Sequence, residues 1–296
     1  MESTLAPRAP ATVFSRIRSS VITFARMRPW HTFWGVVSLA IVIVSFGGPL
    51  VLPLEPLKAD YDNLTSPPSA EYWTGTDLLG RDLTSRLVYG GGVSLFIAAS
   101  SLLLGTIIGT VWGVVSGYLG GKTDILSERF IEILLSLPGL ILAYLMILVF
   151  GDGFLQLILA LAITRIGAVE RVVRSVALSV KQTMYVEAAR SIGTSQIRII
   201  WRHVFPQCGA VLIVLLTMNI GGIIITEASL SFLGLGIAPP TPTWGKMLGE
   251  STMQSFVPIW WMVAYPGFMI TLTVLSFNLF GDGLRDALDP RLRGTM

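Results

Sequence analysis

The sequence has few residues that could bind a metal or form a disulfide. Its single cysteine, Cys208, excludes an internal disulfide and an all-cysteine metal site. Its two histidines, His31 and His203, lie far apart, so no histidine-based metal motif is present. Charged residues make up only 13% of the 296 residues. We therefore expect no metal centre, and we interpret Cys208 as a buried bystander thiol.

Apolar residues, in contrast, are abundant enough to indicate a membrane protein. They account for 52% of the chain, and the mean hydropathy is +0.70, which is above the range of soluble domains. Most of the six apolar segments are long enough to cross about 30 Å of hydrocarbon as a helix. These segments are 33–52, 93–118, 130–150, 154–169, 208–233 and 257–280. The sequence predicts an all-α polytopic membrane protein with six transmembrane helices.

Two of these segments need a further interpretation. The fourth is short because Glu170 and Arg171 follow it, so we expect its helix to continue into water. The first follows about 30 residues and lacks a small-residue cleavage site, so we interpret it as a retained helix and not a signal peptide.

The distribution of lysine and arginine predicts the orientation. Of the 21 basic residues, 17 fall before the first segment, after the sixth, or in the connections between segments two and three and segments four and five. The other side receives only Lys58, Arg81, Arg86 and Lys246. By the positive-inside rule, both termini and the connection between segments four and five are cytoplasmic.

That connection contains a polar stretch, YVEAARSIGTSQIRIIWRHVFPQ (185–207), with helical periodicity. One predicted helical face is apolar, and Glu187, Arg190 and Ser191 lie on the other. The apolar residues are Tyr185, Ala188, Ala189 and Ile192. Gly193 occupies the position of a left-handed helix stop. The small Ala188 and Ala189 permit close approach of a partner surface.

A second short helix is predicted after this turn. Thr194 or Ser195 would cap it, and Pro206 would break it before the fifth segment. Its apolar members are Ile197, Ile200, Trp201 and Val204. The pattern alone favours docking to a partner and contact with lipid headgroups about equally. Its position between two membrane segments disfavours DNA binding, so we expect no nucleic-acid partner.

This stretch resembles the EAA loop of binding-protein-dependent ABC importer permeases. The family pattern is Glu-Ala-Ala, three residues, Gly, nine residues, Ile, one residue, Leu-Pro. The matching residues are Glu187, Ala188, Ala189, Gly193 and Pro206. The chain departs with His203 and Phe205 at the Ile and Leu positions, and a histidine there is similar to the peptide-transporter branch. The resemblance implies that Glu187–Gly193, Arg190 included, couples to an ATPase.

Three further stretches resemble the dipeptide and oligopeptide permeases, in the same order. They are GTDLLGRDLTSRLVYGG (75–91), EASLSFLGLGIAPPTPTWGKML (227–248) and FNLFGDGLRDALDPRLR (277–293). The resemblance covers the chain from about residue 30 and is greatest to the second, C-type permease of the pair. It implies a type I importer fold, with the first helix and an external segment in 1–90. Residues 91–296 would form the permease core, including the coupling loop at 182–207.

The resemblance also implies the function and the partners. The chain would be the permease subunit of an ATP-driven importer of short peptides in the bacterial inner membrane. It would work by alternating access with a homologous second permease, two cytoplasmic ATPase subunits or domains, and an external binding protein. Nickel or glutathione import is an alternative within the class. An ATP-independent channel or secondary transporter is an alternative outside it.

No enzyme chemistry is supported by the sequence. The stretch SGYLGGKTD around Lys122 is similar to a P-loop, but Ser116 replaces its first glycine and no strand precedes it. We interpret it as a turn. No catalytic triad or carboxylate pair has a supporting context. We expect no cofactor in this chain, with ATP and Mg²⁺ bound by the partner ATPases.

Several charged or polar residues have two possible roles. Glu227 in the fifth segment would be costly in lipid unless paired, hydrated or protonated. Together with Asn219 it would either line the translocation pathway or pack structurally, and the structural role is favoured. Asp77, Arg81 and Asp82 would either contact a binding protein or fold the external segment by local pairing, which we favour. We expect the tail residues Asp282, Arg285 and Asp286 to anchor the end of the sixth helix.

Overall fold

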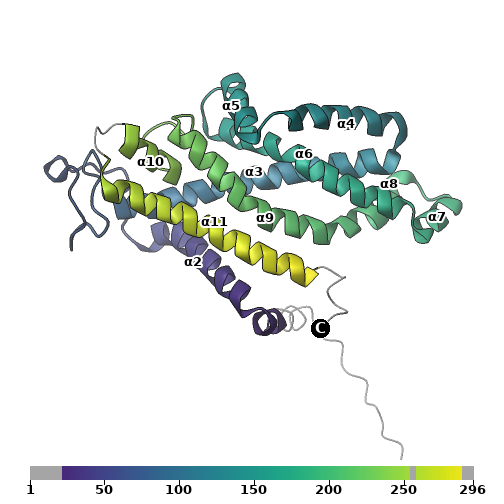
Figure 1. Cartoon of the computed structure of the whole chain (residues 1–296), viewed down its shortest axis with the longest axis horizontal. Coiled ribbons are helices and arrows are strands. Elements are labelled where there is room, and N and C mark those ends of the chain that lie inside the picture. The colour runs from purple at the N-terminus through teal and green to yellow at the C-terminus, as the bar shows by residue number, and fades with distance from the viewer. Residues whose placement is uncertain (1–21, 254–257, 289–296) are drawn as a thin grey trace, which may run out of the picture.

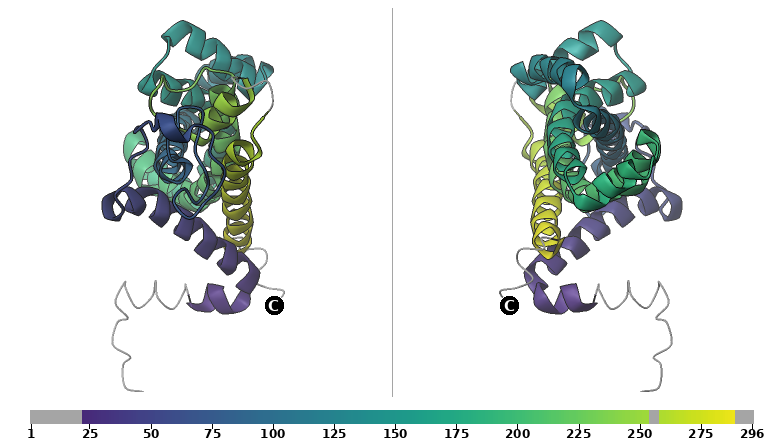
Figure 2. Two further views of the ribbon diagram at one scale, coloured as in Figure 1. Left: turned by 90° about the vertical axis from the view of Figure 1, so that its left-hand side faces the viewer. Right: turned by 90° about the vertical axis from the view of Figure 1, so that its right-hand side faces the viewer.

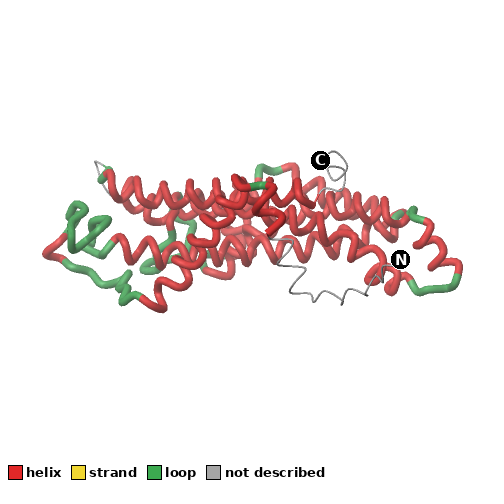
Figure 3. Tube along the Cα trace, turned by 90° about the horizontal axis from the view of Figure 1, so that it is seen from below, coloured by secondary structure: helices red, strands yellow, loops and turns green. Residues whose placement is uncertain are grey.

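The computed structural model describes residues 22–253 and 258–288, and their regular structure is almost entirely helical (Figure 3). The long helices are α2 (Pro29–Val51), α3 (Leu83–Leu119), α6 (Phe154–Lys181), α9 (Phe205–Phe232) and α11 (Trp260–Leu288). The shorter elements are η1 (Tyr61–Asn63), α4 (Gly121–Ser136), α5 (Gly139–Phe150), α7 (Met184–Ser191), α8 (Gln196–Ile199), the π-turn η2 (Ile200–Val204) and α10 (Trp244–Met253).

The long helices run along the long axis of the molecule and separate two ends (Figure 1). Helices α7 and α8 lie at one end, which we call the α7 end. The segment between α2 and α3 lies with α10 at the opposite end, which we call the α10 end. The end-on views show these two ends in turn (Figure 2). Arg8, Arg16, Arg18, Arg291, Arg293 and the beginning of the sixth predicted segment lie outside the described residues.

The central helix α3 packs most intimately against α6, and glycine makes this possible. Gly105, Gly109, Gly113 and Gly117 recur at every fourth position and bring α3 against the α6 backbone. A Cβ atom on Gly109 would lie 2.8 Å from the Ile166 carbonyl oxygen, and one on Gly113 would lie 2.6 Å from that of Glu170. Small residues at this spacing allow membrane helices to approach closely. The α3–α6 pair is therefore the rigid centre of the fold.

Within the described residues, four helices are long and apolar enough to cross a membrane, or five if one bent pair is a single span. The four are Pro29–Val51, Leu83–Leu119, Gln196–Phe232 and Trp260–Leu288. Helix α6 is 28 residues long, but Arg165, Glu170, Arg171 and Arg174 lower its hydropathy. It continues past residue 169, as the sequence predicts. The membrane-protein class is confirmed, and the number six stays a prediction.

The third predicted segment is not one straight helix. Helices α4 and α5 meet at a bend of 96° around Leu137 and Pro138. Proline lacks the N–H that would bond to residue 134, and its ring clashes with that carbonyl in a regular helix. It also disfavours helical geometry at Leu137, which is extended, with φ −97° and ψ 137°. The prediction of a single helix over 130–150 was wrong because it passed over Pro138.

The predicted break at Pro206 was also wrong. The chain passes from α8 through η2 into α9, and together they make one apolar helical stretch of 37 residues. The N–H of Phe205 donates to the carbonyl of Ile200, five residues back, which widens the turn directly before Pro206. Such π-turns insert an extra residue into the hydrogen-bond ladder. We interpret the wide turn as the feature that lets the helix continue past Pro206.

Helix α2 is tied to the end of α11 by close packing and one ion pair. The Arg28 guanidinium lies 2.6 Å from the Asp286 carboxylate. Gly35 of α2 meets the Phe280 ring, and Gly283 of α11 meets His31. The tail therefore anchors the helix end, as the sequence predicts, although the tie is to α2.

The buried apolar residues form two clusters along the helix bundle. The larger extends around α3, α6 and α9 towards the α10 end and includes Ile97, Leu161 and Trp244. The smaller lies at the α7 end, where Tyr118 of α3 packs with residues of α6, α7 and α9. Cys208 is fully buried in the smaller cluster, as predicted. Each end of the molecule therefore has a packed support.

Candidate functional site

Helix α7 carries the first part of the predicted coupling loop. It begins after Thr183, and the Glu187 N–H donates to the Thr183 carbonyl across the first turn. Glu187 is exposed, and its acidic side chain in the first turn suits the positive end of the helix dipole. Its carboxylate forms no ion pair within the described residues. The acidic group of the motif is thus presented outward.

Gly193 ends α7 in the left-handed conformation that the sequence predicts, with φ +76°. The Gly193 N–H donates to the Arg190 carbonyl, and the Thr194 N–H donates to the Ala189 carbonyl. This pair of bonds is a Schellman motif, which favours glycine at this position. Ser195 then precedes α8 as predicted, but its side chain makes no capping hydrogen bond. A Cβ on Gly193 would meet no atom within 4 Å.

The inner side of α7 is fastened to the bundle. Val186 and Ala189 are buried in the smaller core cluster. The Arg190 Nε lies 3.3 Å from the Tyr118 hydroxyl, and its guanidinium lies over the Tyr118 ring at 5.1 Å from the centroid. Tyr118 belongs to the last turn of α3. Helix α7 is therefore in direct contact with the end of the central helix.

The outer side of this region is an exposed apolar surface, which we call the α7 surface. Ile192 is 82% exposed, and Met184, at 88%, is more so. The other members are Tyr185, Ile197 and Trp201. Scattered exposed apolar residues are ordinary, but several gathered in one short region mark an interaction surface.

The predicted apolar face of α7 is therefore largely the outer face. Tyr185, Ala188 and Ile192 are exposed, while Ala189 faces inward beside Val186. Likewise, Ile197 and Trp201 are exposed in the following turns, whereas Ile199 and Val204 are buried. Periodicity located an apolar face but did not show whether the chain itself covers it. Val186 and Ile199, which hold the region to the bundle, were not singled out.

Glu227 lies far from this surface, near the C-terminal end of α9, and is fully buried. The Ser231 hydroxyl donates to its Oε1 at 2.7 Å, and the hydroxyls of Ser94 and Thr243 approach the same carboxyl. Asn219 donates its side-chain amide to the Leu215 carbonyl at 2.7 Å. The two residues are thus not brought together by a shared contact. The hydrogen bond from Ser231 lies within α9, and the Glu227 Oε2 atom has no hydrogen-bond partner among the described residues.

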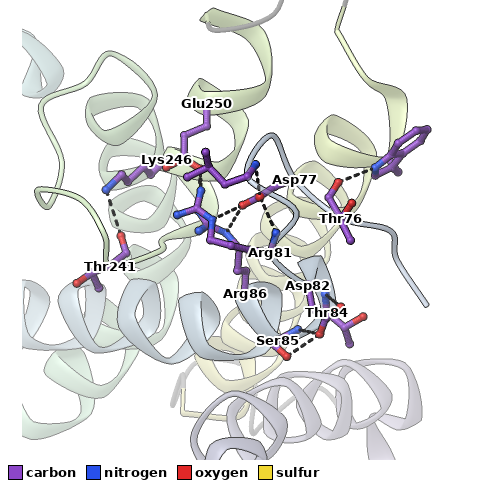
Figure 4. A network of polar contacts seen from close by, with 12 residues as sticks. Thr76, Asp77, Arg81, Asp82, Thr84, Ser85, Arg86, Thr241, Lys246 and Glu250 are labelled. Carbon is purple, nitrogen blue, oxygen red and sulfur yellow. Dashed lines mark hydrogen bonds and ion pairs between the residues drawn. The ribbon is translucent and has the colours of Figure 1, made fainter. Parts of the chain in front are cut away.

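The α10 end contains a buried network of charged residues (Figure 4). The Arg86 guanidinium lies 2.7 Å from Glu250 and 3.3 Å from Asp77. Arg81 bridges the same two carboxylates, at 2.6 Å from Asp77 and 3.4 Å from Glu250. We call these four residues the charge network. It joins the segment before α3 to α10, and Arg86 is fully buried.

Local pairing also folds the rest of the segment between α2 and α3. Asp82 caps α3, because its carboxylate accepts from the N–H groups of Thr84 and Ser85. Hydrogen bonds from Asn63, Tyr72 and the Asp62 N–H lower the pKa of the Asp60 carboxyl below its ordinary value. The folding role predicted for Asp77, Arg81 and Asp82 is confirmed.

A third polar group joins α4 and α6 towards the α7 end. Arg174 makes two parallel hydrogen bonds with Asp124, at 2.5 and 2.7 Å, and lies 3.2 Å from Glu128. The stretch around Lys122 turns at Gly120, between α3 and α4, with positive φ at Gly120 and Gly121, while Lys122 itself lies in the first turn of α4. Arg174 and Asp124 were not singled out from the sequence, although a charge pair flanking apolar segments is a detectable signal.

Comparison with known proteins defines the class. The sequence model for the binding-protein-dependent transport system inner membrane component matches residues 109–294. This stretch includes α6, the α7 surface, α9 and α10. The chain therefore belongs to this family, whose members are permease subunits of ABC importers and not enzymes.

Two individual proteins are similar to this chain over most of its length. The chain is 41% identical over 279 residues to the glutathione transport system permease protein GsiD of Escherichia coli O1:K1, covering 90% of this chain and 92% of that protein. It is 40% identical over 278 residues to GsiD of Pectobacterium atrosepticum, with the same coverage. The predicted membership of the binding-protein-dependent ABC importer permeases is confirmed.

The fold is similar to a solved importer subunit. The match is to a chain of the MetNI methionine ABC transporter in inward-facing conformations, with a TM-score of 0.56. It covers 69% of this chain and 96% of that chain, at 19% identity. At this identity the likeness concerns the fold alone.

Proposed function

We propose that this permease imports short peptides, glutathione among them, and that the α7 surface couples it to a cytoplasmic ATPase. Its partners would be a homologous second permease, two ATPase subunits or domains that bind ATP and Mg²⁺, and an external binding protein. Both termini and the α7 end would face the cytoplasm, and six helices would cross the inner membrane, with the bent α4–α5 pair and α6 each counted as one.

The α7 surface is the observation that carries the coupling role. It combines exposed apolar side chains with an exposed Glu187 on a helix that is fastened from behind. A helix that lies on the lipid surface requires only exposed apolar side chains. Rigid attachment to the helix bundle gives it no advantage. The Schellman turn and the Arg190–Tyr118 contact hold the α7 region rigidly against α3. These features favour protein docking over contact with lipid headgroups.

The attachment of α7 to α3 suggests how ATP binding would move the helices. Closure of two ATPase domains would draw together the α7 regions of the paired permeases. Arg190 and the buried Val186 and Ala189 would pass this motion to α3 and α6, which move as one unit because their backbones are in contact. The pathway between the two permeases would then open to the other side. Such bistable packing is the usual basis of large transitions.

A peptide substrate is supported by two kinds of likeness. The relatives named above are glutathione permeases, and glutathione is itself a tripeptide. His203 and the three further sequence stretches are similar to the peptide-transporter branch. Nickel import stays the second candidate within the class. Neither Glu227 nor Asn219 decides between them.

The α7 surface is tested in vesicles containing both permeases and the ATPases, with binding protein and peptide supplied. Ile192→Ser and Glu187→Lys should leave the permeases inserted and paired, because neither side chain is packed inside the chain. Both should reduce peptide uptake and binding-protein-stimulated ATP hydrolysis about tenfold or more, the usual loss at an interface hot spot. The readouts are uptake, ATP turnover and ATPase co-purification.

Gln196→Ala serves as the matched control, since Gln196 is exposed in the same region but is polar. It should keep both activities. If Ile192→Ser and Glu187→Lys still couple at the native rate, the α7 surface does not dock the ATPase, and lipid contact becomes the better interpretation. Uptake that proceeds without ATPase subunits would instead favour a channel or secondary transporter.

A further inference from the structure

A cavity of about 310 Å³ opens at the α10 end, beside the charge network. Its walls come from the α5–α6 turn, the end of α9, the following loop and α10. The charged residues that line it are Asp152, Lys246 and Glu250. The remaining walls include Ser231, Gly234, Gly236 and Gly249. Its volume lies at the lower end of the range for small-molecule sites.

Lys246 is the cation in this cavity that has no counter-charge. Its ammonium donates to the carbonyls of Ile237 and Thr241, each at the long distance of 3.3 Å (Figure 4). No carboxylate of the described residues lies within 4.0 Å of it. Two neutral acceptors at this distance leave an ammonium group with unused capacity, because it has three donors.

The nearest carboxylate is already used by other residues. Glu250 lies one helical turn after Lys246, but it accepts from Arg86 at 2.7 Å and from Arg81 at 3.4 Å. Asp77 is likewise shared between the same two arginines. With Lys246 included, three cations face two carboxylates in this part of the molecule. These five residues therefore carry one positive charge in excess, while the cavity wall itself also includes the carboxylate of Asp152.

Asp152 supplies an opposite charge elsewhere on the cavity wall. It is exposed in the α5–α6 turn and lines the cavity without pairing with Lys246. Burial lowers the pKa of the Lys246 ammonium, and the Glu250 carboxylate opposes that effect. A partly desolvated ammonium gains more from a carboxylate than an exposed one does. An unpaired ammonium and an unpaired carboxylate on one cavity match the two ends of a zwitterion.

We propose that Lys246 binds the terminal carboxylate of an incoming peptide in this cavity, at the mouth of the permease. Asp152 would face the peptide's amino group, so that the cavity recognises a short zwitterionic chain. This inference rests on the proposed peptide-import function and adds a selectivity step in the permease itself. A carboxylate on the binding protein has the same chemistry and is distinguished by the test.

The test compares a tripeptide with a free C-terminal carboxylate and the same tripeptide with a C-terminal amide. Uptake of each is measured in vesicles with the full complex, the binding protein and ATP. The acid-to-amide uptake ratio of Lys246→Met is divided by that of the native complex. The binding protein is identical in both, so its own preference cancels. We expect Lys246→Met to lower the ratio about tenfold, as expected for loss of a charged hydrogen bond.

Three further variants test the roles of charge, shape and position. Lys246→Arg keeps the cation and should retain most of the native ratio. Lys58→Met is the matched control, because Lys58 is an exposed lysine near the same end that pairs with Glu55 at 2.7 Å and does not line the cavity. It should leave the ratio unchanged. Asp152→Asn should lower the preference for a free amino terminus over an acetylated one.

The outcomes divide cleanly. If Lys246→Met slows acid and amide peptides equally, Lys246 holds the loop or contacts a carboxylate on the binding protein, and the proposal is overturned. A raised binding-protein concentration for half-maximal ATP hydrolysis would identify the second case. An unchanged ratio also overturns it. If the native complex imports no peptide at all, the proposed function fails, which is distinct from a failure specific to Lys246.

Discussion

The α10 end and the α7 end of this permease differ in whether their charged and large apolar side chains have partners within the chain. At the α10 end, Asp77, Arg81, Arg86 and Glu250 form ion pairs with one another inside the chain. At the α7 end, Ile192, Ile197 and Glu187 are exposed on a helix whose inner face is packed. A side chain that is already paired serves folding, whereas one left exposed on a rigid support is available to a partner.

Each end also contains one residue that departs from this pattern. Lys246 is the unpaired cation beside an otherwise paired network, and so it is the residue there with a role left to assign. Arg190 is the reverse case, a motif residue of the exposed end whose guanidinium is engaged with Tyr118. Proximity to a motif therefore does not by itself determine whether a residue contacts a partner.

The largest effect should come from testing whether the two ends lie on opposite sides of the membrane. A phosphatase reporter, active only outside the cytoplasm, should be active when fused after Asp152, in the turn before α6. The same reporter fused after Gln182, directly before α7, should be silent. The measurement is enzyme activity in whole cells, normalised to fusion protein. The reverse pattern would invert the orientation and remove the ATPase from the α7 end.

A large loss of stability should follow removal of Arg86 from the charge network. Arg86→Met leaves Glu250 and Asp77 with Arg81 alone in a buried site, and breaking a buried ion pair costs about 3–5 kcal/mol. We expect a lower melting temperature and poor pairing with the second permease, measured on detergent-purified protein. Lys58→Met, which removes an exposed cation, should change neither. Equal stability of the two variants would mean that the network does not hold the α10 end together.

A smaller effect on stability, but a large one on coupling, is expected at Gly193. Its φ of +76° costs a non-glycine residue about 1 kcal/mol, while a Cβ there meets no atom of the chain within 4 Å. Gly193→Ala should therefore fold with a small loss and Gly193→Val with a larger one, because β-branched residues rarely adopt positive φ. Only the bulkier valine should abolish stimulated ATP hydrolysis, by clashing with the docked subunit. Equal coupling by both variants would show that no partner approaches the turn.

The smallest expected effect concerns pH and the segment between α2 and α3. The pKa of Asp60 is lowered in the folded protein, so its contribution to stability is present above the ordinary carboxyl pKa. That contribution is lost as pH falls through the lowered value, below about pH 4. Limited proteolysis of the segment should accelerate in that range. Asp60→Asn should cleave faster at neutral pH and show a weaker acid response; an unaltered acid response would assign the effect elsewhere.

Much of this architecture was predictable, because lipid imposes strong rules on sequence. Hydropathy located the apolar helices, since a backbone in hydrocarbon must satisfy its hydrogen bonds internally. The Gly193 turn was also predicted, because few residues adopt positive φ. The resemblance of Glu187–Gly193 to a known motif assigned the family, which the comparisons confirmed. The residue-level coupling role stays a proposal.

What the tertiary structure decided was how helix breaks and side-chain pairs resolve. Pro138 bends its helix by 96° while Pro206 does not end its own, because a π-turn precedes only Pro206. The sequence contained the α3 glycines but not the α6 backbone that they meet. It likewise contained Lys246, Glu250 and Arg86 without saying which cation would be left unpaired. Such choices depend on distances between residues far apart in the chain, which periodicity and composition do not contain.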